Sequence, residues 1–311
     1  MITDSFLCEL KNKYDYNDKL TRALGKILPS MTKYYGYFSW DIIKSALLDC
    51  EIIMCDSYST IGMVIKRLNL INIDESTFLI KEDLNYVSGI YLSRPKVNYD
   101  DILNSYVIDG VRRYIILSHT YNLDSARGLA SLTSQLCKLI KSYKNEFVLK
   151  DDVIIKRTGL EKKFYKIVNQ NEITLKLTSY VNVGIEEGIN SYDEQEILKI
   201  ILGDNYETFD YQNTKSIALC LKDRLGLKEK LDCCEINGNT SDFIYEYEGE
   251  SDLFSELSLL ADDSCILENK KNNYNITKEE RDSINDEIKF LINRLVNNLI
   301  EYKKRAKISE F

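Results

Sequence analysis

The sequence predicts an α+β fold, in which a small mixed sheet and its helices come first and a mainly helical C-terminal part follows. Three observations predict it. Short apolar runs typical of strands gather between residues 77 and 118. Apolar side chains then recur at helical spacing over residues 124–144, and again over residues 278–307. We therefore expect an α/β subdomain over residues 1–145 and a mainly helical subdomain, interrupted by a short β excursion, over residues 146–311.

The first subdomain is predicted to alternate between helices and strands. Apolar residues at helical spacing favour helices over 6–28, 40–48 and 61–68. Glu51 to Cys55 is typical of a short buried strand, and further strands are expected over 77–80, 89–92, 106–108 and 114–117. The dipeptide Asp109-Gly110 lies between the last two strands and is common in two-residue turns. We therefore predict a turn at Asp109-Gly110.

The helix predicted over residues 124–144 has two different faces. Its apolar stripe consists of Leu129, Leu132, Leu136, Leu139, Ile140 and Tyr143. On the other side fall Arg127, Ser131, Ser134, Lys138 and Lys141. The plainest interpretation of this second set is a solvated helix face. Strands are then expected over 153–155, 164–168 and 173–177, and a helix from about 185 to 202 ends at Gly203, a good C-cap residue.

The last hundred residues are predicted to be mostly helical. Thr277 and Glu280 form the S/T-x-x-E capping box that typically begins a helix. The helix that follows carries an apolar stripe of Ile284, Ile288, Leu291, Ile292, Leu295, Leu299 and Ile300. Core packing is the simpler interpretation of this stripe, and a surface for a partner helix is the alternative.

Composition excludes several classes of function. The 49 Asp+Glu residues outnumber the 41 Lys+Arg residues and give a formal net charge of −8. Phosphate-neutralising proteins need a concentrated basic face, so no nucleic-acid partner is expected. No apolar run approaches the roughly 18 residues that a membrane helix needs, and no cationic segment leads into an apolar stretch at the N-terminus. We therefore expect a soluble, cytoplasmic protein without a membrane partner.

The 8 cysteines and the single histidine narrow the chemistry further. No CxxC pair is present, so reduced and mostly buried thiols are expected. His119 alone cannot supply two imidazoles to a zinc ion within one copy of the chain. No Gly-x-Ser-x-Gly motif accompanies His119, which is predicted to lie partly exposed at the end of a strand.

Two segments carry a resemblance to a known family. Residues 132–143 read Leu-Thr-Ser-Gln-Leu-Cys-Lys-Leu-Ile-Lys-Ser-Tyr, and residues 186–190 read Glu-Glu-Gly-Ile-Asn. With the order of elements over roughly residues 85–205, they resemble gluzincin-type zincin metallopeptidases, and in particular a clostridial-type group of zinc peptidases. In that group the first segment reads roughly L-T-H-E-L-x-H-L-I-K-S-Y, and the second contains E-E-G-[LI]-N. The resemblance implies a zincin-like fold with an active-site-type helix.

The resemblance also implies that the active-site motif is degenerate. In the working motif, two histidines one helical turn apart and a distal glutamate bind zinc, while a second glutamate is the general base. Ser134 and Lys138 stand at the histidine positions, Gln135 stands at the base position, and Glu187 stands at the third ligand position. A charged ammonium has no lone pair for zinc, and a carboxamide cannot accept a proton from water. We therefore expect no bound metal and no other cofactor, although the family itself uses zinc.

Lys138 acquires a different role under the same resemblance. Its ammonium is expected to take the vacated cation position and to pair with Glu187. Without the resemblance, Ser134, Lys138 and Lys141 belong to a solvated helix face. Glu186 and Glu187 are then acidic residues favoured in the first turn of another helix.

Three functions follow as hypotheses. The first is a catalytically inactive pseudopeptidase that binds a protein or peptide in a groove beside the strand at Gly89 to Arg94. The second is a metal-independent hydrolase that uses Cys137 or Lys138 as its nucleophile. The third is a helical structural or interaction protein whose C-terminal helix mediates assembly. The sequence leaves the identity of the partner and the oligomeric state open.

Overall fold

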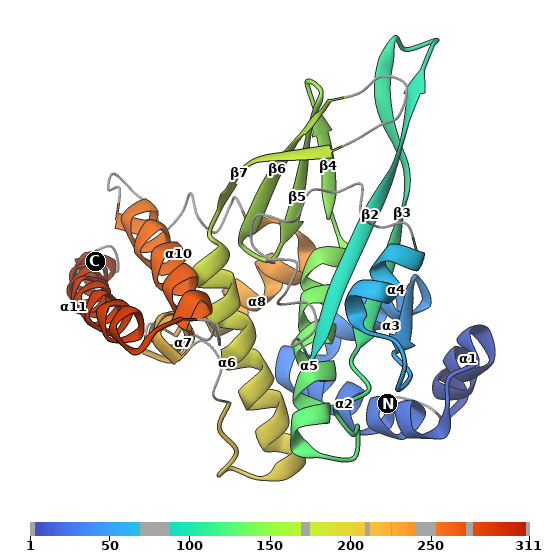
Figure 1. The fold of residues 1–311 in the computed structure, drawn as a ribbon, viewed down its shortest axis with the longest axis horizontal. Helices are drawn as coiled ribbons and strands as arrows, with labels where there is room; N and C mark the ends of the chain where they lie inside the picture. The colour runs from blue at the N-terminus through green and yellow to red at the C-terminus, as the bar shows by residue number, and fades with distance from the viewer. Residues whose placement is uncertain are drawn as a thin grey trace.

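The computed structural model describes residues 4–68, 88–168, 175–208, 212–224, 226–240, 253–271 and 276–308. It confirms a mixed α+β architecture, in which a three-stranded and a four-stranded sheet are combined with helices (Figure 1). The strand predicted over residues 77–80 lies outside the described residues. None of the described helices is long and apolar enough to cross a lipid bilayer.

The N-terminal helices are α1 (Asp4–Tyr14), α2 (Asp18–Tyr35), α3 (Trp40–Leu48) and α4 (Ile61–Arg67). They accompany a three-stranded sheet made of β1 (Cys50–Met54), β2 (Gly89–Asp100) and β3 (Ser105–Leu117). The strand order is β1-β3-β2, with β1 parallel and β2 antiparallel to the central β3. Among the strands that the structure describes, the predicted strand at Gly89 is therefore at an edge of this sheet.

The turn predicted at Asp109-Gly110 is wrong, because both residues lie inside β3. The hairpin of β2 and β3 turns instead at residues 101–104, where Asp100 Oδ1 accepts backbone hydrogen bonds from Ile102 and Leu103. The pairing of β2 with β3 shifts register beside Asp109-Gly110, and Gly110 has φ +96°. A glycine with positive φ suits a β-bulge as well as a turn, so the dipeptide produces a bulge in a long hairpin.

Helix α5 (Ala126–Tyr143) begins where Ser125 caps it, with Ser125 Oγ accepting from the Gly128 amide at 3.2 Å. The four-stranded sheet follows as β4 (Phe147–Lys150), β5 (Val153–Thr158), β6 (Glu161–Ile167) and β7 (Leu175–Val181). Its strands lie in sequence order, and each pair is antiparallel. One face of this sheet carries Ile154, Tyr165, Ile167 and Leu175 and packs against Val97 and Tyr106 of the hairpin.

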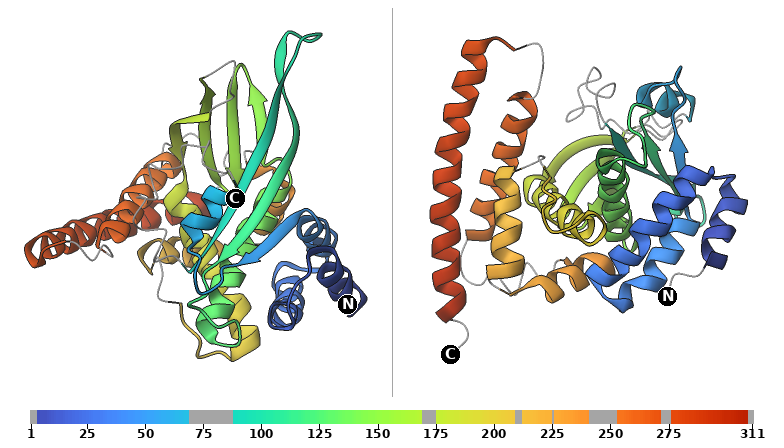
Figure 2. Two further views of the ribbon diagram at one scale, coloured as in Figure 1. Left: turned by 45° about the vertical axis from the view of Figure 1, so that its right-hand side comes forward. Right: turned by 90° about the horizontal axis from the view of Figure 1, so that it is seen from below.

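The C-terminal part is mainly helical. It comprises α6 (Val183–Leu202), α7 (Gln212–Leu219), a π-helical segment η3 (Cys220–Arg224), α8 (Lys228–Asn237), α10 (Leu253–Lys271) and α11 (Lys278–Ile308). The predicted capping box is confirmed, because the Thr277 amide donates to Glu280 at 2.8 Å and the Glu280 amide donates to Thr277 at 3.2 Å. Helix α11 runs along α10 at one side of the molecule (Figure 2).

Helix α6 connects the two largest apolar cores. One core joins α2, α3, β1 and α5 to Ile197 and Leu198 of α6 and Ile236 of α8. The other packs Ile185 and Ile189 of α6 against η3, α8, α10 and α11. Because α6 is covered from both directions, it is buried along most of its length.

Close packing around α6 depends on glycine. A Cβ atom added to Gly188 would lie 2.3 Å from the Thr214 carbonyl oxygen of α7, far inside normal contact distance. We predict that Gly188→Ala destabilises the protein by roughly 1–3 kcal/mol, because α6 and α7 must move apart. Urea unfolding would measure this, with Gly25→Ala as the control, since a Cβ at Gly25 finds its nearest atom at an ordinary 3.4 Å. An equal loss in both variants would contradict the prediction.

Candidate functional site

The structure brings Lys138 of α5 and Glu187 of α6 into direct contact. Lys138 Nζ lies 2.7 Å from Glu187 Oε1, as the expected replacement of a metal bridge by an ion pair requires. The two side chains are 23% and 19% exposed, so the pair is near the surface but partly shielded from water. Burial opposes the charge of Lys138, but Glu187 outweighs it and raises the pKa of the lysine above its ordinary value. The expected pairing of Lys138 with Glu187 is confirmed.

The other residues of the degenerate motif lie on α5 beside this pair. Gln135 is buried and Ser134 is partly exposed. Within the part of the chain that the structure describes, no hydrogen bond joins either side chain to Lys138 or Glu187. Cys137 is fully buried, and burial together with the nearby Asp193 raises the pKa of its thiol to about 12. Among the motif positions that the structure describes, the polar contact is therefore the one between Lys138 and Glu187.

These residues do not fit a zinc ion. The carboxylate of Glu187 is engaged by an ammonium that repels any cation and offers no lone pair. A serine hydroxyl and a carboxamide are the other groups that the motif supplies, and neither replaces an imidazole as a zinc ligand.

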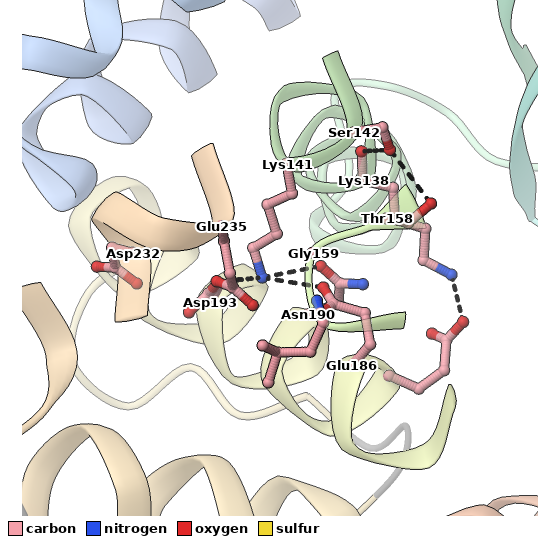
Figure 3. A network of polar contacts seen from close by, with 12 residues as sticks. Lys138, Lys141, Ser142, Thr158, Gly159, Glu186, Asn190, Asp193, Asp232 and Glu235 are labelled. Carbon is pink, nitrogen blue, oxygen red and sulfur yellow. Dashed lines mark hydrogen bonds and ion pairs between the residues drawn. The ribbon is translucent and has the colours of Figure 1, made fainter. Parts of the chain in front are cut away.

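A second ion cluster lies one helical turn further along α5, and the sequence interpretation missed it. The sequence pattern predicts a solvated position for Lys141, but its side chain is completely buried. Lys141 Nζ lies 2.7 Å from Asp193 Oδ2, 3.3 Å from Glu186 Oε1 and 3.4 Å from Glu235 Oε2 (Figure 3). The Lys141 end of this polar face is therefore internal, because α6 and α8 cover it with acidic side chains, whereas Arg127 is exposed and Lys138 is partly exposed.

The cluster continues through Asp193 to a second buried lysine. Lys222 Nζ, from η3, lies 2.5 Å from Asp193 and 2.7 Å from Asp232 of α8. The hydroxyls of Tyr34 and Tyr35 on α2 donate to the two oxygens of Asp193 at 2.6 and 2.9 Å. Asp193 thus receives hydrogen bonds from four side chains on three other elements.

The pKa shifts of the buried groups show how this cluster reduces its excess of negative charge. Burial opposes ionisation of Asp193, but Lys141 and Lys222 outweigh it and hold the pKa of this carboxyl below its ordinary value. Burial also opposes the charge of both lysines, yet their acidic neighbours keep the pKa of each above its ordinary value. Burial raises the pKa of Glu186 well above normal, and raises that of Glu235 as well. Two ammonium groups therefore hold Asp193 in its ionised form, whereas burial favours the neutral forms of Glu186 and Glu235.

Three of these acids could hold a cation by geometry alone. Oxygen atoms of Asp193, Asp232 and Glu235 lie within 4.8 Å of one another, and all three residues are buried. The position between the two aspartates is taken by the ammonium of Lys222. Lysine ammonium groups of the protein therefore neutralise these acids in place of a metal ion, and the cluster is a structural ion network.

One sequence signal could have revealed this network. Glu186, Asn190 and Asp193 recur at i, i+4 and i+7, which places them along one side of α6. Asn190 Oδ1 accepts from Lys141 Nζ at 3.1 Å, so this polar stripe meets the polar side of α5. A polar stripe on each of two helices in one chain indicates that the stripes can face each other. Lys222, Asp232 and Glu235 carry no comparable pattern.

Comparisons with known proteins add nothing to this geometry, because no protein-family profile, no curated protein and no solved structure matches the chain. The site must therefore be interpreted from its own residues.

We predict that Lys141→Met destabilises the protein far more than Lys138→Met does. Removing Lys141 leaves Asp193, Glu186 and Glu235 buried with one cation fewer, which typically costs about 3–5 kcal/mol. Lys138 and Glu187 are partly exposed, so water can compensate for loss of that pair at a cost of about 1 kcal/mol or less. Urea unfolding of both variants tests the difference, and similar losses would refute it.

A buried carboxyl beside the first turn of α6 makes the stability of the protein depend on pH. Asp262 of α10 accepts a hydrogen bond from the Gly184 amide at 2.6 Å, yet burial raises the pKa of this carboxyl from 3.8 to about 6. The folded state therefore holds a proton that the unfolded chain releases, so this contribution to stability is lost as the pH rises from about 4 to 6. Relative to wild type, Asp262→Asn should gain roughly 2 kcal/mol between pH 4.5 and pH 7. Urea unfolding at the two pH values checks this, and a constant difference would contradict it.

Proposed function

We propose that the protein is a catalytically inactive, zincin-like pseudopeptidase that binds a protein or peptide segment. The observation that carries the proposal is the 2.7 Å contact between Lys138 and Glu187. In the motif that the sequence resembles, a zinc ion bridges these two helix positions, and here an ammonium bridges them instead. A fixed cation keeps α5 and α6 together but cannot activate water as a bound metal does.

The general-base position supports the absence of catalysis. Gln135 has a carboxamide where the resemblance requires a carboxylate, and a carboxamide cannot take the proton of an attacking water. General-base catalysis alone contributes roughly 10²–10⁴ in rate, so its loss adds to the loss of the metal. The binding function is what such a scaffold retains.

The binding site that we propose is the outer edge of β2 at Gly89 to Arg94, which no other described strand covers. In the order β1-β3-β2 this strand has one paired and one outer edge, where an extended peptide can add as a further strand. Most of the segment is buried, and Ile90 and Arg94 keep partial exposure. Pro95 has no amide hydrogen, so β2 cannot donate a backbone hydrogen bond to an added strand from that position. The peptide would therefore pair with the part of β2 that precedes Pro95.

The alternative of a metal-independent hydrolase has weaker support. A nucleophilic cysteine needs its thiolate, whereas Cys137 is buried and its pKa is raised to about 12. A nucleophilic lysine needs its neutral amine, whereas Glu187 stabilises the ammonium of Lys138. Both candidate nucleophiles are thus favoured in their unreactive forms.

A second candidate function, assembly through α11, is favoured by exposed apolar side chains. Phe290 is 62% exposed and Ile300 is 49% exposed, while Ile288 and Leu291 of the same helix pack into the protein core. Deleting the helix would expose that core, so the sharper test is the double variant Phe290→Ser and Ile300→Ser. Solution scattering that shows unchanged particle mass in this variant would argue against assembly through α11.

Restoring the motif tests the proposed origin of the site. We predict that the wild-type protein neither retains zinc nor cleaves peptides, whereas Ser134→His, Gln135→Glu and Lys138→His together bind one zinc ion per chain. The matched control keeps Lys138 and changes Ser134 and Gln135 alone, and it should not hold zinc. Elemental analysis after dialysis measures the metal. Stoichiometric zinc in the wild type, or none in the triple variant, would overturn the proposal.

Hydrogen exchange tests the peptide-binding part separately. A panel of extended peptides would be screened against the wild-type protein, and a bound peptide should protect backbone amides within residues 89–94. Protection elsewhere, with no change in this segment, would refute the proposed edge. A panel that contains no binder would refute general peptide recognition by this strand.

A further inference from the structure

The four-stranded sheet has a second face that differs from the packed one. Side chains alternate between the faces of a strand, so Lys166 of β6 points away from its buried neighbours Tyr165 and Ile167. Cross-strand pairing extends this outward face over all four strands. Lys150, Lys166 and Lys176 on it are all exposed, so the face is open to solvent.

Register places these lysines in a single row across the sheet. Lys150 of β4 pairs with Val153 of β5, Val153 pairs with Lys166 of β6, and Lys166 pairs with Lys176 of β7. The next row on the same face contains Val148, Ile155, Phe164 and Ser179. A cationic row therefore runs beside a row that is mostly apolar.

The direct pairing of Lys166 with Lys176 is unfavourable for the isolated protein. Side chains opposite each other in an antiparallel pair begin about 5 Å apart, and like charges there reduce stability. Among the residues that the structure describes, no acidic side chain forms an ion pair with any of the three lysines of the row. Asp151 and Asp152, in the turn between β4 and β5, lie at the Lys150 end, so the Lys166 and Lys176 end is the more positive.

The composition of the row beside the lysines favours an acidic protein segment over a nucleic acid. Nucleic-acid strands need successive aromatic platforms for their bases, whereas the row beside the lysines offers one aromatic ring, Phe164, between aliphatic side chains. A segment that alternates acidic and apolar residues fits both rows, with carboxylates over the lysines and apolar groups over Ile155 and Phe164.

We propose that the outward face of the sheet β4-β5-β6-β7 is a docking surface for an acidic, apolar-containing segment of a partner protein. Lys166 and Lys176 share its carboxylates, and the bound segment relieves their mutual repulsion. This surface is separate from the β2 edge and does not rest on the pseudopeptidase proposal.

Charge reversal at one lysine separates binding from folding. Lys176→Glu places opposite charges across from each other, so the melting temperature should rise or stay the same. The same change removes a binding cation and adds a repulsive carboxylate. The probe is a fluorescein-labelled twelve-residue peptide rich in glutamate and leucine, measured by fluorescence anisotropy. We expect Lys176→Glu to bind it at least about tenfold more weakly than wild type, which corresponds to about 1.4 kcal/mol.

The matched control is Lys26→Glu, which changes net charge equally at an exposed position on α2. It should bind the peptide like wild type. A peptide with lysine in place of glutamate and a twelve-nucleotide oligothymidine serve as alternative ligands. The proposal is overturned if the acidic peptide does not bind, if both lysine variants weaken it equally, or if the oligonucleotide binds more tightly.

Discussion

Charge neutralisation inside the helical core is the constraint on which the rest of the structure depends. Lys141 and Lys222 are fully buried, and an unpaired buried ion costs several kcal/mol. Asp193 lies between the two ammonium groups and accepts hydrogen bonds from both tyrosines of α2. Helices α5, α6 and α8 and the segment η3 must therefore come together as one unit, because omitting any of them would leave a buried charge without a partner. Helix α2 joins this unit through the hydrogen bonds of its tyrosines to Asp193.

This network also sets the register of α5 against α6, and with it the proposed site. Lys138 and Lys141 are one turn apart on α5, and their partners Glu187 and Glu186 are adjacent on α6. Neighbouring helix residues point about 100° apart, so one glutamate faces the interior and the other faces the surface. The buried contact fixes the distance between the helices, and the outer pair is a consequence of the same approach.

The sequence predicted those features that local chemistry determines. The capping box at Thr277, the end of α6 at Gly203 and the pairing of Lys138 with Glu187 are confirmed, the last through a resemblance that supplied the long-range geometry. The polar pattern of α5 alone does not reveal the burial of Lys141, because its partners are 45 to 94 residues away and become visible only when the polar stripe of α6 is considered with it. The turn at Asp109-Gly110 was wrong for a related reason: a glycine with positive φ suits a turn and a bulge alike, and only the partner strand decides between them.

An ammonium bridge has a physical advantage for a protein that binds without catalysis. Where a metal ion joins two helices, their association is linked to the concentration of that ion. The charge of Lys138 belongs to a side chain of the protein, so its contact with Glu187 does not depend on the concentration of any ion. The buried lysine one turn away already holds α5 and α6 together, which leaves the outer position free to change its residues without loss of the fold. On the proposed descent from a zincin, the inner network is what would have allowed the outer site to lose its metal.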